Sequence, residues 1–231
     1  MLLLEEARPP GYSKSMADKH TQAAYDQIAA QYAVKNAAMP KALTTAGRRF
    51  LELLGPGPRI LDAGCGAGRD MAWLQRRGAT VAGMDLSRRM LALAQSMARG
   101  PLLQMDMRSL ALRAGIFAGV WCCASLLHLP KRQAPLALAE MRRVLVPHGL
   151  LFLSVQEGTG EGWEEGPYPA VKRFFARYSH EEMATLLAQS GFRVIESSAN
   201  AGRWQRWLQF LAVAGIGKHN GFISLATQHR G

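Results

Sequence analysis

Short apolar runs alternate with stretches of helical periodicity along the first two thirds of the chain. The apolar runs predict strands at 59–63, 80–84, 101–105, 117–123 and 149–155. Apolar residues at helical spacing between these runs predict helices near 69–77, 87–98 and 131–145. Because strands that alternate with helices form right-handed β-α-β units, this order predicts an open, mostly parallel sheet with helices on both faces.

The two flanks of this pattern complete the expected domain. Helices near 20–33 and 41–54 precede the first strand and predict an N-terminal helical cap. After the fifth strand, 156–178 is irregular, polar and aromatic, which predicts a lid insertion. A further helix and two strands are expected at 179–190, 192–196 and 207–214. We therefore expect a single α/β domain built on a seven-stranded sheet.

Two end segments fall outside the pattern. The first is rich in proline and glycine, and its apolar start is cut short by Glu5 and Glu6, before the roughly 7 residues that a signal peptide needs. We expect a flexible leader over 1–18, the folded domain over 19–214 and a tail over 215–231.

Charge and cysteine content limit the possible partners. The chain has 28 basic and 17 acidic side chains, a formal charge of +11, which suggests an anionic partner. The basic residues occur only as scattered pairs, so we expect a small-molecule substrate rather than nucleic acid. Three cysteines without paired spacing predict neither disulfides nor a metal site, and no apolar run reaches the roughly 18 residues of a membrane span. We expect a cytoplasmic protein with no membrane partner. The sequence leaves the oligomeric state open between monomer and dimer.

A glycine-rich loop follows the first predicted strand. Glycines occur at 64, 66 and 68, and the first of them comes two residues after Asp62. The loop leads directly into a helix, whose first backbone amides face a ligand. A dinucleotide-binding loop would need glycine at 69, where this chain has Arg69. The loop therefore predicts a different cofactor at the carboxyl end of the first strand.

Two further acids end the next two strands. Asp85 comes 23 residues after Asp62 and is placed to accept both hydroxyls of a ribose. Asp106 ends the third strand, where it would accept from an adenine amino group beside the apolar Met107. Singly, each acid also fits a helix cap or a solvated loop. The three in this order predict S-adenosylmethionine (SAM).

The chain resembles the class I SAM-dependent methyltransferases over about residues 20–213. Gly64–Asp70 is similar to the GCGxGRD loop of a bacterial small-molecule subgroup (methyltransferase domain 11/25-like), and 117–130 and 143–151 resemble two of its later motifs. Ala118 and His148 depart from those motifs, and the tail matches nothing recognised. The resemblance implies a Rossmann-like fold and methyl transfer from SAM to O or N of a small molecule, releasing S-adenosylhomocysteine.

The resemblance also supports a set of site residues. The expected cofactor-binding residues are Tyr25, Tyr32, Asp62, Gly64, Cys65, Gly66, Gly68, Arg69, Asp85, Leu86, Met90, Asp106, Met107, Cys123 and Ala124. His128 is the expected catalytic residue, taking a proton from the acceptor, or else it only packs near the next helix. The lid is expected to contact substrate through Trp163, Tyr168, Phe174 and Arg177.

Three other functions remain open at this point. Cys122 or Cys123 would act as a nucleophile in an RNA methyltransferase, but neither follows a proline as in such enzymes. The positive charge leaves an RNA or protein methyltransferase as an alternative. The third alternative is a SAM-binding module without catalysis.

Overall fold

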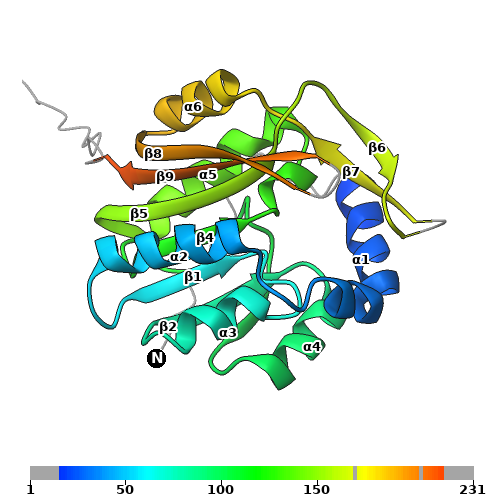
Figure 1. Ribbon diagram of the computed structural model, residues 1–231, viewed down its shortest axis with the longest axis horizontal. Coiled ribbons are helices and arrows are strands. Elements are labelled where there is room, and N and C mark those ends of the chain that lie inside the picture. Colours follow the sequence, from blue (N-terminus) through cyan, green and yellow to red (C-terminus); the bar gives the residue numbers. More distant parts are fainter. Residues whose placement is uncertain (1–15, 169–170, 203–204, 216–231) are drawn as a thin grey trace, which may run out of the picture.

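A seven-stranded sheet forms the centre of the computed structural model, which describes residues 16–168, 171–202 and 205–215 (Figure 1). The strand order is β3-β2-β1-β4-β5-β9-β8, and β9 runs antiparallel to the other six strands of this sheet. The strands are β1 (Arg59–Ala63), β2 (Thr80–Asp85), β3 (Leu102–Gln104), β4 (Phe117–Cys123), β5 (Leu145–Gln156), β8 (Phe192–Ala201) and β9 (Arg206–Ala214). The expected seven-stranded, mostly parallel α/β fold is confirmed.

Helices cover both faces of the sheet. They are α1 (Met16–Lys35), α2 (Lys41–Leu54), α3 (Arg69–Gln75), α4 (Arg88–Met97), α5 (Ala134–Val144) and α6 (His180–Gln189), with 3-10 turns η1 (Leu126–His128) and η2 (Lys131–Gln133). One buried cluster joins α5 and α6 to one face, and a second joins α2 and α3 to the other. In the second cluster, Trp121 stacks on Phe152 with ring centroids 3.7 Å apart. This two-sided core fixes the strand ends that carry the polar residues.

The segment expected to be irregular is instead largely a β-hairpin. Strands β6 (Glu161–Glu165) and β7 (Lys172–Ala176) pair antiparallel after β5, beside α1 (Figure 1). Phe174 and Trp163 face each other across the pair, with ring centroids 5.7 Å apart. The prediction of irregular structure over 156–178 is wrong for these ten residues, because their pairing depends on packing against α1 and η1 rather than on a strong local pattern.

The ends of the chain are described only in part. Helix α1 begins at Met16, so residues 16–18 of the expected leader are helical. The remaining leader, and the expected tail beyond Gly215, lie outside the described residues. Within the described part of the chain, no helix has both the length and the apolar character to cross a membrane.

Candidate functional site

The glycine-rich loop connects the end of β1 to α3 in a conformation that requires glycine. Gly64, Gly66 and Gly68 have φ angles of +84°, +52° and +86°, in the left-handed region. The amides of Gly64 and Cys65 both donate to the carbonyl of Met84 at 2.9 Å. The loop is thereby fixed to the end of β2, with its turn facing the carboxyl edge of the sheet.

A second loop packs directly on the first. A Cβ at Gly64 would lie 2.4 Å from Cβ of Ser125, which follows β4. The Ser125 hydroxyl donates to the carbonyl of Ala63 at 2.6 Å and lies 3.2 Å from the sulfur of Cys122. Close backbone approach at this point brings the ends of β1 and β4 together.

Asp85 is held by backbone amides at the end of β2. Its two carboxylate oxygens accept from the amides of Gly66 at 3.0 Å and Ser87 at 2.8 Å. Burial raises the pKa of Asp85, and the amide hydrogen bonds oppose that rise. Ser87 caps α4 by accepting from Met90, and it donates to Asp26 of α1 at 2.6 Å. This network joins α1 to the end of β2.

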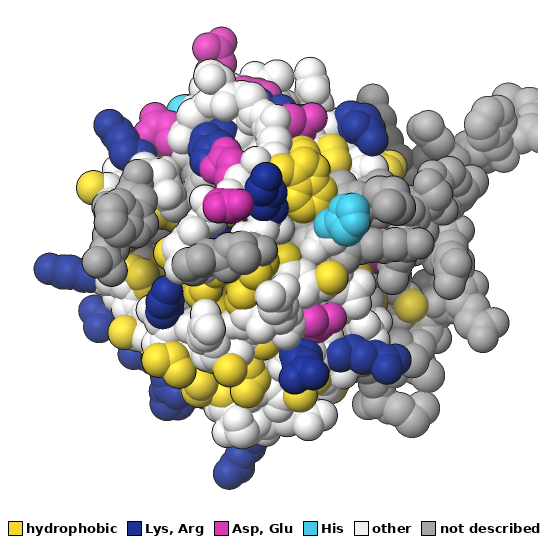
Figure 2. Space-filling view, turned by 90° about the vertical axis from the view of Figure 1, so that its right-hand side faces the viewer, with side chains coloured by type: hydrophobic (Ala, Val, Ile, Leu, Met, Phe, Trp, Pro, Cys, Tyr) yellow, Lys and Arg dark blue, Asp and Glu magenta, His cyan; other side chains and the backbone are white. Residues whose placement is uncertain are grey.

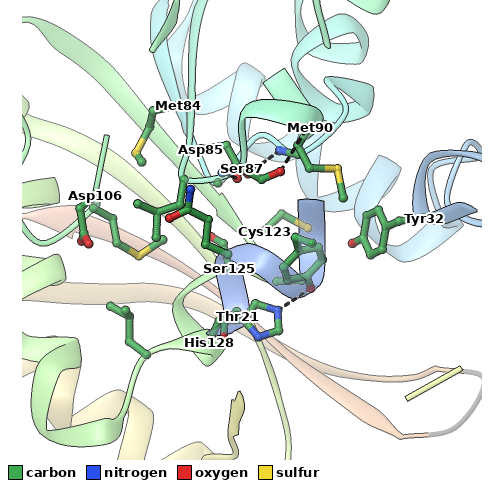
Figure 3. A pocket seen from close by; sticks show the side chains of 18 residues that line it. Thr21, Tyr32, Met84, Asp85, Ser87, Met90, Asp106, Cys123, Ser125 and His128 are labelled. Carbon is green, nitrogen blue, oxygen red and sulfur yellow. Dashed lines mark hydrogen bonds between the residues drawn. The ribbon is translucent and has the colours of Figure 1, made fainter. Parts of the chain in front are cut away.

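A cavity of about 780 Å³, including its open mouth, lies between α1 and the carboxyl ends of the strands. Its lining residues are Thr21, Gln22, Tyr25, Tyr32, Gly64, Gly66, Met84, Asp85, Leu86, Ser87, Met90, Asp106, Met107, Cys123, Ala124, Ser125, His128 and Leu129. Figure 3 shows Asp85, Ser87 and Met90 on one side of it and Thr21 and His128 on the other. We call it the first cavity.

A second cavity, of about 490 Å³, shares Tyr32, Gly64, Gly66 and Cys123 with the first. It is also lined by Asp62, whose Oδ2 atom is buried and has no hydrogen-bond partner among the described residues. Burial, followed by the neighbouring carboxylate of Asp70, raises the pKa of Asp62 well above its usual value. Such an unpaired acceptor fits a cationic or hydrogen-bonding ligand group.

His128 lies at the centre of a hydrogen-bonded chain on the wall of the first cavity. Its Nδ1 is 2.7 Å from the carbonyl of Phe174, and its Nε2 is 2.7 Å from Oη of Tyr25. Because a carbonyl only accepts, Nδ1 carries the proton in the neutral ring and Nε2 accepts from Tyr25. Arg173 of β7 donates to the same Oη at 3.1 Å. Burial lowers the pKa of His128 to about 4.

The structure brings most of the expected cofactor-binding residues to the two cavities. Of the fifteen, Asp62, Cys65 and Arg69 line only the second cavity, and Gly68 lines neither. Asp106 lines the first, but both of its oxygens accept hydrogen bonds from Arg108, at 2.6 to 2.9 Å. The adenine contact expected of Asp106 thus competes with a buried ion pair.

The four expected substrate residues line neither cavity. Tyr168 is buried against Tyr32 on α1, and Trp163 packs on Phe174. Arg177 forms an ion pair with Glu164 on the hairpin. Helix α1 and the hairpin form the roof of the first cavity. These side chains support that roof instead of facing the cavity itself.

The expected set omits several residues that line the cavities. The first cavity adds Thr21, Gln22, Met84, Ser87, Ser125 and Leu129, and the second adds Ala33, Asn36, Ala37, Ala67, Asp70 and Met97. One signal was present in the sequence. Thr21 is four residues before Tyr25, so a helix places both on one face.

Comparison with known proteins places this architecture among methyltransferases. A family model described as a methyltransferase domain matches residues 60–149. Methyltransferase GfsG of Streptomyces halstedii is 35% identical over 126 residues, 48% of this chain and 45% of the relative. Malonyl-[acyl-carrier protein] O-methyltransferase of Erwinia pyrifoliae is 34% identical over 161 residues, 62% of this chain and 57% of the relative. The chain thus spans about half the length of these curated relatives.

A solved structure matches nearly the whole fold. It is the 1,6-didemethyltoxoflavin-N1-methyltransferase of Burkholderia thailandensis, crystallised with 1,6-didemethyltoxoflavin and S-adenosylhomocysteine. Its TM-score is 0.70 at 21% identity, covering 91% of this chain and 95% of that one. The family model therefore identifies residues 60–149 as a methyltransferase domain, and the solved structure shows that nearly the whole chain follows the same fold.

Proposed function

We propose that this protein is a methyltransferase that moves a methyl group from SAM to O or N of a small-molecule acceptor and releases S-adenosylhomocysteine. The observation that carries the proposal is the pair of adjacent cavities at the carboxyl ends of β1, β2 and β4, which share four lining residues. One contains an unpaired buried carboxylate oxygen and the other contains a carboxylate oriented by amides. This combination suits a ligand with an ammonium group at one end and a ribose further along.

The residues present fit SAM. Asp62 would accept from its ammonium group and Asp85 from its ribose hydroxyls, while Met84, Leu86 and Met107 give the first cavity an apolar wall for adenine. When bound, SAM supplies a methyl group already activated on a sulfonium centre. The task of the chain is then to orient an acceptor and exclude water.

Tyr25 and His128 would handle the proton that the acceptor loses. In the observed arrangement, a proton passes from the acceptor to Oη of Tyr25 while the Tyr25 proton moves to Nε2 of His128. Because burial lowers the pKa of His128 to about 4, the resulting imidazolium is poorly stabilised. Proton transfer therefore accompanies methyl transfer and does not precede it.

The proposal extends to the partner and compartment. All three cysteines are free, in keeping with the reducing cytoplasm. On the face that carries α1 and the hairpin, Lys and Arg side chains are dispersed among acidic and apolar ones, as Figure 2 shows. This dispersal favours a small molecule over RNA, whose binding requires a continuous basic surface.

Calorimetric titration with SAM and with S-adenosylhomocysteine tests the cofactor assignment. We expect both to bind, and Asp62→Asn and Asp85→Asn to weaken binding about tenfold or more, the loss for a charge-assisted hydrogen bond. Asp26→Asn is the matched control, because Asp26 accepts a hydrogen bond from Ser87 but does not line the cavity. Circular dichroism verifies that each variant is folded. Absence of binding by the unmodified chain would overturn the proposal.

A further inference from the structure

The side of the first cavity formed by α1 and η1 has features of an acceptor site. We infer that an uncharged small molecule binds there, with its own polar group hydrogen-bonded to Oγ1 of Thr21. The inference rests on the proposed methyl transfer and specifies the chemical class of the acceptor.

Thr21 is the observation that points to a ligand. Its side chain is buried, with 7% of the residue exposed, and it lines the first cavity. Its hydroxyl has no hydrogen-bond partner among the described residues, although a helical threonine can bond to a carbonyl one turn earlier. A buried hydroxyl left unpaired is unfavourable, so a ligand that offers it a partner is favoured in this position.

The position of Thr21 suits the acceptor rather than the cofactor. Thr21 precedes Tyr25 by one helical turn, and Tyr25 bonds to His128. Figure 3 shows Thr21 and His128 across the cavity from Asp85, the expected ribose ligand. An acceptor bonded to Thr21 would therefore lie beside the groups proposed to take its proton.

The charge of the lining excludes an ionic acceptor. Among the 18 lining residues that the structure describes there is no lysine or arginine, and the two acids are Asp85 and Asp106. A carboxylate bound there would lose hydration without gaining a cation from the cavity wall. A cationic acceptor fares no better, because Asp106 is already paired with Arg108 and Asp85 is the expected ribose ligand.

Arg173 is a cation close to this site, but it does not line the first cavity. Its guanidinium donates to Tyr25 and lies 5.0 to 5.4 Å from the ring centroids of Tyr25, Tyr168 and Phe175. Its charge acts on the phenol of Tyr25 and on the imidazole of His128. The guanidinium is therefore engaged by Tyr25 and the surrounding rings and adds no cation to the cavity lining.

Fractionated metabolites test the charge class. Small molecules from a cell extract are divided by ion exchange into anionic, cationic and uncharged pools, and each is incubated with the protein and SAM labelled on the methyl group. We expect label in the uncharged pool. Label in a charged pool, or in RNA or protein added separately, overturns the inference and leaves methyl transfer intact. Label in no pool, with SAM still bound in calorimetry, contradicts methyl transfer and the inference falls with it.

Thr21 variants then test the contact, with the labelled pool as substrate. Thr21→Val keeps the shape and removes the hydroxyl, so we expect the acceptor KM to rise about tenfold with an unchanged SAM dissociation constant. Thr21→Ser, which keeps the hydroxyl, should restore most of the loss. Thr44→Val, at a half-buried threonine of α2 whose hydroxyl donates to the carbonyl of Lys41, is the matched control. A native KM for Thr21→Val, or weaker SAM binding instead, would overturn the assignment.

Discussion

Replacing His128 with glutamine should remove a large part of the acid sensitivity of folding. The imidazole is buried and neutral, with a pKa of about 4 against 6.5 for a free side chain. Below pH 6.5 the unfolded chain therefore binds a proton that the folded chain does not, and unfolding becomes more favourable as pH falls. This stabilisation by the neutral ring is complete above 6.5 and is lost progressively down to about pH 4.

The magnitude follows from the two pKa values. A difference of 6.5 − 4 corresponds to about 3 kcal/mol of unfolding free energy once pH is below both. Near pH 5 most of it is already lost, about 2 kcal/mol relative to pH 7.5. Burial also raises the pKa of Asp62 and of Asp85, so only the difference between the native chain and the variant isolates His128.

Urea unfolding of the native chain and His128→Gln at about pH 7.5 and pH 5 provides the measurement. We expect the native chain to lose about 2 kcal/mol more than the variant on acidification. Tyr25→Phe is the control: it removes the hydroxyl that bonds to Nε2 but leaves the buried imidazole, so it should keep the native pH dependence. Equal losses for the native chain and His128→Gln would refute the reasoning that burial depresses this pKa.

Three further outcomes follow from local geometry. Gly68→Ala, at φ +86° and with its new Cβ only 3.1 Å from α4, should lower the free energy of unfolding in urea by about 2 kcal/mol. Gly57→Ala, at φ +63° in open space, should lower it by about 1 kcal/mol. Equal losses for the two variants would contradict the steric argument. Trp121→Phe removes a buried hydrogen bond to Asp70 at 3.0 Å, and we expect the free energy of unfolding to fall by about 2–4 kcal/mol, while a loss below 1 kcal/mol would argue against it. Burial raises the pKa of Cys122 to about 11, so a thiol reagent near pH 8 should modify it only after denaturation, and rapid native labelling would contradict that burial.

The sequence predicted those parts of the fold that local pattern determines. The loop at Gly64–Gly68 and the acid at 85 are contiguous signals, because a strand, a turn and a helix start follow one another directly. The hairpin was missed because its glycines and glutamates have weak strand propensity, and its pairing is stabilised by α1 and η1.

The arrangement around His128 depends on contacts that one sequence does not reveal. Tyr25 lies 103 positions from His128 and 148 positions from Arg173 in the sequence, and it forms a hydrogen bond with each of them. Tyr25 and His128 could be named as candidates, but neither the hydrogen bond from the phenol to Nε2 nor the contact with Arg173 could be predicted. The same limitation applies to the substrate prediction, because Trp163, Tyr168 and Phe174 pack on each other or on α1 and line neither cavity.

The close approach of Gly64 and Ser125 restricts how this site can vary among related chains. A side chain at 64 has room only if the one at 125 shrinks, since their Cβ atoms would otherwise lie 2.4 Å apart. Shrinking Ser125 to glycine, however, removes the hydroxyl that bonds to Ala63. The two positions, 61 residues apart, therefore evolve as one unit, and paired substitutions there should be strongly non-additive.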